Sequence, residues 1–534
     1  MGRRSKAPIR RKGRGVEESR WLRDGWWTTT FTFTVSLFLY LRTMAPTIYN
    51  LDSAELTTAA STGGLVRATG YPLYLIIGRL WSHLPIGDVG YRMNLLSAVC
   101  AALTLALAER ILRRIGVGVW ARLAALGLLA TAQFFWALAL IAEVYTLHTA
   151  ILAGIILALL RWAERPTPGR LAVATFLTGV GFGNHVATVL AAPGCVWFVL
   201  NAAPKKALEL RSLCLAVIGL AAGLAVYVYL PLVYWTRPEF NYVGWFDAYG
   251  RFDPINLATL EGLWWLVSGK VFSDVMMAYS TPELLREVGH FGAELVRAFM
   301  VIGIGPGLVG IVVSWRRSRA LGGLLLLVFA ISAGFYINYR VIDKDTMFLP
   351  AYLVWALWVG IGYHWLIEWA GRPSSAIRPA ARRTTVLALK AIMAGAVIFA
   401  VNWTWPLVDL SDDWSTRERG EEILELAGPD ALIVGWWGTV PVVEYLQLVE
   451  GQRRDVQAIN RFLIRPDDLL TLIVHDLDRR PIYIDEPLDG LPESVKALPA
   501  GPLFKLVRAR VPNPEKRSNR PDAARRDTPN QRNF

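Results

Sequence analysis

Cysteine is scarce in this chain, with only three residues among 534. All three, Cys100, Cys195 and Cys214, fall inside apolar runs, where a cysteine is typical of a small buried hydrophobe. Their number and spacing exclude a disulfide framework and a cysteine-based zinc site. Charged residues are also few, at 19%, whereas 54% of the residues are hydrophobic. Because a soluble domain averages a lower apolar fraction, the composition excludes a single soluble domain.

Motifs that hold nucleotides or catalytic metals are also missing. The chain has no P-loop, no dinucleotide-binding glycine motif, no HExxH and no nucleophile elbow in a suitable context. Gly181-Phe182-Gly183 lacks the third glycine and a preceding soluble strand, so it is no phosphate fingerprint. We therefore predict no cofactor; a divalent cation is compatible with the sequence but not indicated by it. The basic head is long and the first apolar run lacks a small-residue cleavage site, so we expect a permanent first helix.

Apolar runs near 20 residues recur along the chain and predict an all-α polytopic membrane protein. They lie at 26–45, 92–108, 117–135, 137–160, 213–234, 298–314, 321–339, 346–369 and 384–403. Residues 170–200 have basic flanks on both sides, which favours two further crossings; one tilted helix stays open. The expected total is about eleven transmembrane helices.

The net charge of +13 follows from basic clusters between the apolar runs. Lys and Arg accumulate in cytoplasmic loops. Residues 1–25 are accordingly predicted to be a flexible, basic cytoplasmic tail, followed by a transmembrane domain over 26–404. This topology predicts a multi-pass protein of the cell membrane, with the N-terminus cytoplasmic and the C-terminal domain outside.

Two loops are expected on the outer face. Residues 46–90 form the first, in which the short interrupted apolar segment 71–86 suits a membrane-parallel or re-entrant helix. Residues 236–295 form a second loop rich in aromatic side chains, which suit interfacial helices or a saccharide-stacking surface. The first loop opens with Asp52 and Glu55, three residues apart. At a helix start this spacing puts both carboxylates on one face, although an ordinary helix N-terminus with Asp52 as cap is the alternative.

The region after the last apolar run changes character. Over residues 405–511 we predict a small α/β extracytoplasmic domain. Its expected elements are a helix at 418–426, a strand at 431–434, a helix at 442–449, and strands at 456–460 and 481–484. Residues 512–534 are polar, basic and rich in proline, and are predicted to be a disordered tail.

A series of short stretches carries a family resemblance. They are PT at 46–47, LDSAE at 51–55, GYPLY at 70–74, RMNLLSA at 92–98, EVY at 143–145, YRVIDKDTMFLP at 339–350, EYLQLVEG at 444–451 and RDV at 454–456. In this order they resemble the bacterial relatives of protein O-mannosyltransferases, which are placed in the GT-C glycosyltransferase superfamily. The resemblance implies a GT-C fold whose first outer loop carries an acidic motif that acts on a polyprenyl-phosphate-linked sugar. Members usually show His-Pro-Pro-Gly before the Pro-Leu-Tyr, where this chain has Arg67-Ala68-Thr69-Gly70.

The resemblance and the topology together give a functional hypothesis. It is an inverting glycosyltransferase that moves a mannose-like sugar from a polyprenyl-phosphate-linked donor to a protein or envelope acceptor on the extracytoplasmic face. Asp52 is the candidate general base, and Glu55 orients the acceptor or shares that role. The candidates for binding the substrate or the donor phosphate are Arg67, Tyr71, Glu143, Tyr145, His185, Arg340, Asp343 and Lys344.

Purely structural interpretations of some of these residues, and other functions, stay open. Arg67 also suits an ordinary snorkelling arginine, and residues 340–344 also suit a surface ion-pair cluster. An alternative function is a transporter or flippase lined by Glu143 and the glycine-interrupted helix near residue 181. A non-catalytic membrane scaffold of the same fold is a third possibility. The expected partners are a lipid-linked sugar donor, a protein or glycan acceptor and the membrane, with no nucleic acid.

Overall fold

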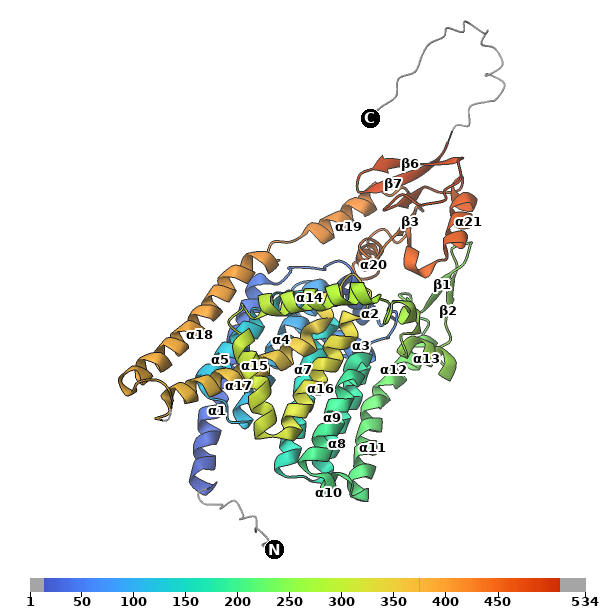
Figure 1. The fold of residues 1–534 in the computed structure, drawn as a ribbon. Helices are drawn as coiled ribbons and strands as arrows, with labels where there is room; N and C mark the ends of the chain where they lie inside the picture. Colours follow the sequence, from blue (N-terminus) through green and yellow to red (C-terminus); the bar gives the residue numbers. More distant parts are fainter. Residues whose placement is uncertain (1–13, 374, 510–534) are drawn as a thin grey trace, which may run out of the picture.

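The computed structural model describes residues 14–373 and 375–509. Figure 1 shows a bundle of long helices with a small domain of strands and short helices at one end. The predicted all-α membrane fold with a small C-terminal α/β domain is confirmed. Of the two predicted tails, residues 1–13 of the first and all of 512–534 lie outside the described residues.

The first helix is longer than the sequence predicted. α1 extends over Arg14–Thr43, whereas we expected a flexible tail as far as residue 25. That expectation was wrong for residues 14–25. The basic residues there are interspersed with good helix formers such as Glu17, Glu18 and Leu22, and adding residues to an existing helix costs less than starting one.

Six segments of the described chain are long and apolar enough to cross a membrane, by length and composition. They comprise α4 (Val89–Arg114), α7 (Val144–Glu164), α11 with α12 (Leu210–Leu224 and Tyr229–Trp235), α16 (Arg319–Ile337), α17 (Leu349–Gly371) and α18 (Pro379–Val408). The bundle also holds α1 and the shorter helices α5 (Val119–Ala130), α8 (Pro168–Asn184), α9 (Ala192–Ala202) and α15 (Ile304–Arg317). The number of about eleven crossings stays a prediction.

The bundle has an enclosed centre and an apolar exterior. α17 is apolar on all sides and buried almost throughout, as expected of a central helix. α11 and α18 instead expose large apolar side chains, such as Val217 at 66% and Ile398 at 64%. An exposed apolar surface of this kind suits contact with lipid.

The ambiguous stretch at 170–200 forms two helices, as the basic flanks favoured. α8 ends at Asn184, and a 3-10 helix at Val186–Ala191 leads into α9. The break falls at His185, whose backbone is extended and whose ring accepts a hydrogen bond from the Ala187 N–H at 3.1 Å. The chain therefore turns back near the predicted bend at 181–185.

Short elements cover the end of the bundle that adjoins the small domain. They are α2 (Asp52–Thr62), α3 (Pro72–Trp81), α6 (Gln133–Ala137), β1 (Gly244–Phe246), β2 (Phe252–Pro254), α13 (Leu260–Val267) and α14 (Thr281–Ala298). α3 is the short helix predicted within 71–86. α14 lies across the ends of the bundle helices in Figure 1 and buries only one side, including Phe291 and Leu295. The region 236–298 thus contains the helices α13 and α14, and their interfacial position stays a prediction.

The C-terminal domain is a five-stranded mixed sheet with the strand order β4-β3-β5-β7-β6. The predicted elements are found as α19 (Ser415–Leu426), β3 (Leu432–Gly435), α20 (Val440–Leu448), β4 (Gln457–Asn460) and β5 (Ile482–Ile484). Three elements were not predicted: α21 (Pro466–Asp476), β6 (Val495–Ala500) and β7 (Leu503–Arg508). β3, β4 and β5 pair in parallel, while β7 pairs antiparallel to both β5 and β6.

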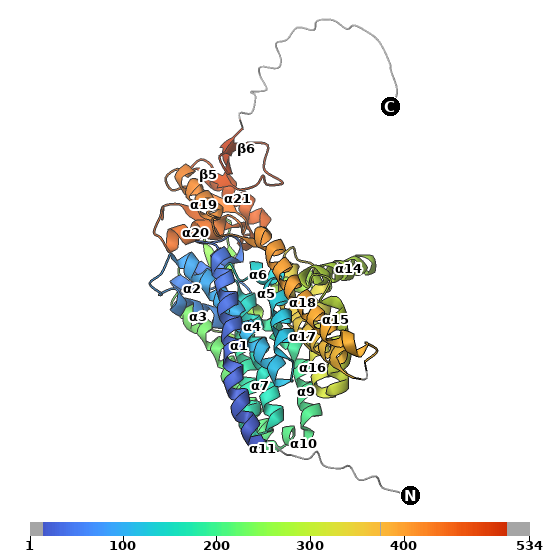
Figure 2. The same ribbon diagram turned by 90° about the vertical axis from the view of Figure 1, so that its left-hand side faces the viewer.

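This domain packs directly on residues 46–90, the first of the two loops predicted to lie on the outer face. Its core around α19 and α20 includes Ile48 and Ala54 of that loop, and α20 lies above α2 in Figure 2. The Gly90 N–H donates to the hydroxyl of buried Tyr445 at 3.3 Å. Arg417 adds an ion pair to Asp88 at 3.5 Å. The sheet domain and the loop that carries Asp52 therefore form one packed unit.

Candidate active site

The carboxylate pair lies in the first turn of α2. The helix begins at Asp52, and its N-cap is Leu51, which makes no side-chain capping bond. The alternative of Asp52 as the cap is therefore wrong, although both acids still benefit from the positive end of the helix dipole. Leu51 has a φ of 56°, a conformation that costs energy in a non-glycine residue. The surrounding contacts hold the carboxylates at this turn despite that cost.

Two buried side chains of α4 position the loop before and beside α2. The Asn94 amide donates to the carbonyls of Ala45 and Thr47, at 3.0 and 2.8 Å. Ser97 accepts from the Glu143 N–H at 3.0 Å, and the Ala142 N–H donates to Ser53 of α2 at 3.2 Å. These contacts explain why the stretch 92–98 accompanies the acidic motif in the sequence.

Arg67 joins the two carboxylates. Its Nη2 lies 2.6 Å from Asp52 Oδ1, and its Nε lies 3.4 Å from Glu55 Oε2. Its backbone N–H also donates to Glu55 Oε1 at 3.0 Å. The Asp52 side chain is 24% exposed and that of Glu55 only 3%. A ligand can reach Asp52, whereas Glu55 is occupied by Arg67.

Burial and the neighbouring opposite charges shift the pKa values of Glu55 and Arg67 in opposite directions. Burial raises the pKa of Glu55 to about 7, the charge of Asp52 adds to the rise, and Arg67 opposes it. Burial by itself would lower the pKa of Arg67, but Asp52 and Glu55 hold that pKa above its ordinary value. Arg67 therefore stays charged, while Glu55 exchanges a proton near neutral pH.

The position of Arg67 depends on a pairing with the second outer loop. The Leu65 N–H donates to the Phe240 carbonyl at 3.0 Å, and the Tyr242 N–H donates to the Leu65 carbonyl at 2.9 Å. Gly64 permits this approach, because a Cβ at that position would lie 2.6 Å from the Phe240 oxygen. The pairing delivers Arg67 between the carboxylates and the C-terminal domain.

Aromatic rings enclose the Arg67 guanidinium on its other side. The ring of Trp437, from the C-terminal domain, lies 4.0 Å from Cζ. Phe272 and Phe462 lie at 5.8 and 5.9 Å. A cation above an aromatic face is attracted by the ring quadrupole. Phe272 lies in the aromatic-rich loop 236–295, but no sequence signal linked these three residues to Arg67, because they come from distant segments.

A cluster of tilted rings lies beside the carboxylates. Tyr71 and Tyr145 flank His185 at centroid distances of 5.8 and 5.7 Å, and His148 lies 5.4 Å from the same ring. Burial raises the pKa of the Tyr71 hydroxyl, and the negative charge of Asp52 adds to the rise. The predicted residues Tyr71, Tyr145 and His185 are thus brought together, with Glu143 within electrostatic reach of Asp52.

The three candidates near residue 340 do not share one location. The exposed side chain of Asp343 lies within electrostatic reach of Asp52, and partial desolvation together with the charge of Asp52 raises its pKa. Arg340 pairs with Glu283 of α14 at 2.5 Å. Lys344 pairs with Glu287 of the same helix and with the Tyr279 hydroxyl. The ion-pair interpretation therefore describes Arg340 and Lys344, but not Asp343.

A cavity of about 750 Å³ opens between the second outer loop and the C-terminal domain. Five of its lining side chains are aromatic: Tyr234, Trp235, Tyr242, Phe246 and Phe252. At one wall the Tyr242 hydroxyl donates a short hydrogen bond to Glu444. Burial raises the pKa of Glu444 to about 8, and the charge of Glu55 contributes to the rise. The cavity thus adjoins the carboxylate cluster through Glu444, which the sequence placed in a motif but not in the site.

No group of three or more His, Cys, Asp or Glu side chains is placed to hold a metal ion within 14–373 and 375–509. The carboxylates of the site are instead neutralised by Arg67. The arrangement offers an accessible carboxylate, a fixed cation and an adjoining aromatic cavity, which suits proton transfer next to an anionic leaving group.

Comparisons with known proteins place this geometry in context. Residues 52–208 match the family described as "Protein O-mannosyl-transferase TMEM260 N-terminal domain". The mouse protein O-mannosyl-transferase TMEM260 is 30% identical over 188 residues, which are 34% of this chain and 27% of the mouse protein. Its Dictyostelium discoideum counterpart is 21% identical over 470 residues, 79% of this chain and 55% of that protein. The chain thus spans about half, or less, of the length of these relatives.

Two solved structures share the architecture at 12% identity. ArnT from Cupriavidus metallidurans, bound to undecaprenyl phosphate, gives a TM-score of 0.54 and matches 91% of this chain and 98% of its own. The Archaeoglobus fulgidus oligosaccharyltransferase, tethered with an acceptor peptide, gives 0.50 and matches 87% and 70%. These likenesses show that the fold is GT-C. The predicted resemblance to protein O-mannosyltransferase-like membrane proteins is confirmed.

Proposed function

We propose that this GT-C membrane protein, a relative of protein O-mannosyltransferases, is an inverting glycosyltransferase. It moves a mannose-like sugar from a polyprenyl-phosphate-linked donor to a protein or envelope acceptor. The reaction takes place on the extracytoplasmic face in this proposal, which is supported by the basic clusters at the opposite ends of the helices, since Lys and Arg accumulate in cytoplasmic loops. The complexes of the two GT-C neighbours, one with undecaprenyl phosphate and one with an acceptor peptide, support a lipid-linked donor and a macromolecular acceptor.

We assign different roles to Asp52 and Glu55 because their side chains differ in exposure. Asp52 has one oxygen on Arg67 and is 24% exposed, so an acceptor hydroxyl can approach it. Glu55 is 3% exposed and already accepts the Arg67 backbone N–H. Asp52 is therefore the general base, and Glu55 positions Arg67.

In the chemical step, Asp52 acts on the acceptor hydroxyl and Arg67 acts on the departing phosphate. The acceptor oxygen attacks C1 of the sugar, and Asp52 takes the hydroxyl proton as the new C–O bond forms. The bond between C1 and the phosphate oxygen breaks, and its electron pair leaves with the polyprenyl phosphate. Arg67 supplies positive charge where the phosphate becomes more anionic. Attack from the side opposite the leaving group inverts the configuration at C1. A positioned general base is worth roughly 10²–10⁴ in rate.

The cavity beside Glu444 is the route we assign to the acceptor. Its aromatic lining suits stacking on sugar rings or on apolar side chains of a polypeptide. Exposed polar groups that line it, including Arg237 and Glu239, can hydrogen-bond an extended chain. An acceptor lying there ends next to Glu444 and, beyond it, the Glu55–Arg67–Asp52 cluster.

The substitution Asp52→Asn tests this function, since it keeps the shape of the side chain and removes the base. Envelope glycans are compared between a deletion strain and the same strain complemented with the wild type, Asp52→Asn or Asp253→Asn. Asp253 is an exposed carboxylate of β2 and serves as the matched control. We expect the wild type and Asp253→Asn to restore the glycan and Asp52→Asn to fail at equal membrane abundance. Restoration by Asp52→Asn would contradict the assigned base. If the protein moved the donor across the membrane of proteoliposomes without forming a glycan product, the result would favour transport.

A further inference from the structure

A second cavity lies at the other end of the bundle, away from α2 and the sheet domain. It has a volume of about 630 Å³ and opens among the ends of α4, α7, α9, α15 and α16. That volume falls within the ~300–1,000 Å³ typical of ligand sites. None of its lining residues belongs to the carboxylate cluster. It is therefore a separate site.

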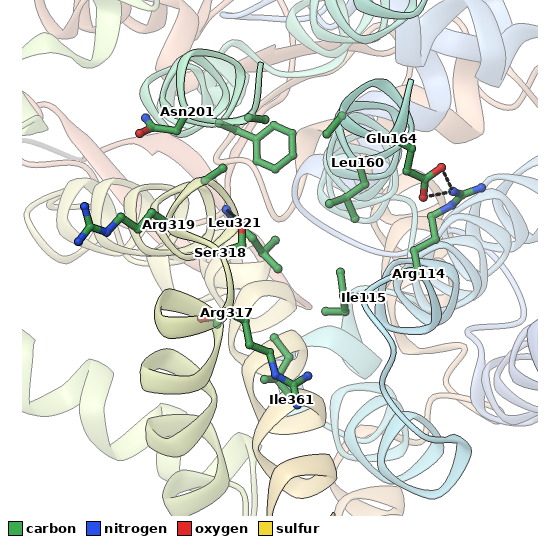
Figure 3. A pocket seen from close by; sticks show the side chains of 15 residues that line it. Arg114, Ile115, Leu160, Glu164, Asn201, Arg317, Ser318, Arg319, Leu321 and Ile361 are labelled. Atoms are coloured by element: carbon green, nitrogen blue, oxygen red, sulfur yellow. Dashed lines mark hydrogen bonds and ion pairs between the residues drawn. The ribbon is translucent and has the colours of Figure 1, made fainter. Parts of the chain in front are cut away.

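The cavity has apolar walls. Figure 3 shows Leu160, Leu321 and Ile361 around its opening, together with Ile115. Ile361 is 2% exposed, so it is part of the packed core. These side chains come from different helices and form a surface suited to hydrocarbon.

Its rim is basic. Arg114, Arg317 and Arg319 line it against a single carboxylate, Glu164. Glu164 is engaged by Arg114 at 2.5 Å, and Glu368, which does not line the cavity, lies 3.8 Å from Arg317. Figure 3 shows this pair across the opening from Arg317, while Arg319 extends outward from α16. The rim therefore carries an excess of positive charge.

The start of α16 adds to this field. Its N-cap Ser318 lines the cavity and accepts a hydrogen bond from the Leu321 N–H at 3.2 Å. α16 therefore begins at the cavity wall, and the partial positive charge of its N-terminus reinforces that of the arginines. The C-terminal ends of α4, α7, α9 and α15 also lie at the cavity, and the arginines offset the partial negative charge of these ends.

We propose that this cavity binds the phosphate headgroup of an anionic membrane phospholipid. The opening lies at the ends of membrane helices, where lipid headgroups are found, and basic pockets between such helices suit acidic lipids. Arg317 holds the phosphate, the exposed Arg319 adds positive charge at the rim, and the first methylene groups of the acyl chains lie on the apolar walls. The bound lipid neutralises the rim and links the α15–α16 turn to the ends of α4 and α7. This binding is independent of the sugar-transfer reaction.

Native mass spectrometry of the purified full chain tests the site with two lipids, phosphatidylglycerol and phosphatidylcholine. The double variant Arg317→Gln/Arg319→Gln is compared with Arg316→Gln/Arg378→Gln, which removes the same charge from exposed positions that do not line the cavity. We expect the wild type and the control pair to retain phosphatidylglycerol over phosphatidylcholine. The cavity variant should bind phosphatidylglycerol at least about tenfold more weakly.

A second variant, Ala202→Trp, blocks the cavity without changing charge, because Ala202 is an exposed lining residue at the end of α9. It should also release the phospholipid. Equal retention by the cavity pair and the control pair would overturn the proposal. Displacement of phosphatidylglycerol by millimolar inorganic phosphate would overturn it as well, because the site would then take a soluble anion instead of a lipid.

Discussion

The indole ring of Trp437 lies 4.0 Å from the guanidinium carbon of Arg67, whose Nη2 pairs with Asp52 at 2.6 Å. One residue of the C-terminal domain thus touches the cation that holds the proposed base. The domain also shares a core with the first outer loop through Ile48 and Ala54. We infer that the sheet domain completes the active site by fixing Arg67, in addition to any role in binding acceptors.

Replacing Trp437 should therefore slow transfer without unfolding the protein. Trp437→Ala removes a cation–π contact that is worth about 0.5–2 kcal/mol, so we expect kcat/KM to fall roughly 2–30-fold. Trp437→Phe keeps a ring and should recover part of that loss. Trp436→Ala is the matched control, because the neighbouring ring stacks on Arg461 and is 39% exposed. Equal losses at 436 and 437 would show that the effect is not specific to Arg67.

Glu55→Gln should change how stability depends on pH. Burial raises the pKa of Glu55 to about 7, above its ordinary value of 4.5, so between these pH values the folded protein binds more protons than the unfolded chain. The contribution of Glu55 is therefore fully present at low pH and is lost as the pH rises through 7. Gln does not titrate. The Tm of the wild type minus that of Glu55→Gln, measured in detergent, should fall between pH 5 and pH 8; a constant difference would contradict the raised pKa.

Tyr242→Phe should weaken the junction between the second outer loop and the C-terminal domain. The Tyr242 hydroxyl donates to Glu444, and burial raises the pKa of that acid to about 8. Removing the donor leaves the acid without this partner, which costs about 1 kcal/mol for a typical hydrogen bond. We expect a lower Tm and a higher KM for the acceptor. Tyr249→Phe, at a ring that is 60% exposed, is the control and should leave both unchanged.

The global architecture was accessible from sequence because its signals are local. Apolar runs of membrane length predicted the bundle, and alternating short helix and strand patterns predicted most of the sheet domain. β6 was missed because it contains Pro499, which is tolerated at a sheet edge but argues against a strand. The spacing of Asp52 and Glu55 correctly indicated a shared helix turn.

The working geometry of the site was not accessible in the same way. Trp437 and Phe272 contact Arg67, and Tyr242 lies within electrostatic reach of Glu55, but no local pattern links these three residues to the carboxylates. Sequence also grouped Arg340 with Asp343, although neighbouring loop residues can face opposite ways. Such contacts depend on how distant loops pair, as at Leu65 and Phe240. Tertiary packing decides them.

The contrast between Arg67 and Arg340 gives a final prediction about which cation serves the departing phosphate. Arg340→Gln removes one half of a half-exposed ion pair with Glu283, and such pairs contribute little. We expect transfer within about threefold of the wild type. Arg67→Lys keeps the charge, but an ammonium cannot reproduce the planar fork that contacts Asp52 and Glu55 while stacking on Trp437. Transfer should drop at least about tenfold, mainly through kcat, since the phosphate gains charge in the transition state. If Arg340→Gln were the more damaging change, the phosphate would have to bind near α14 and the reaction centre would shift from Asp52 toward Asp343.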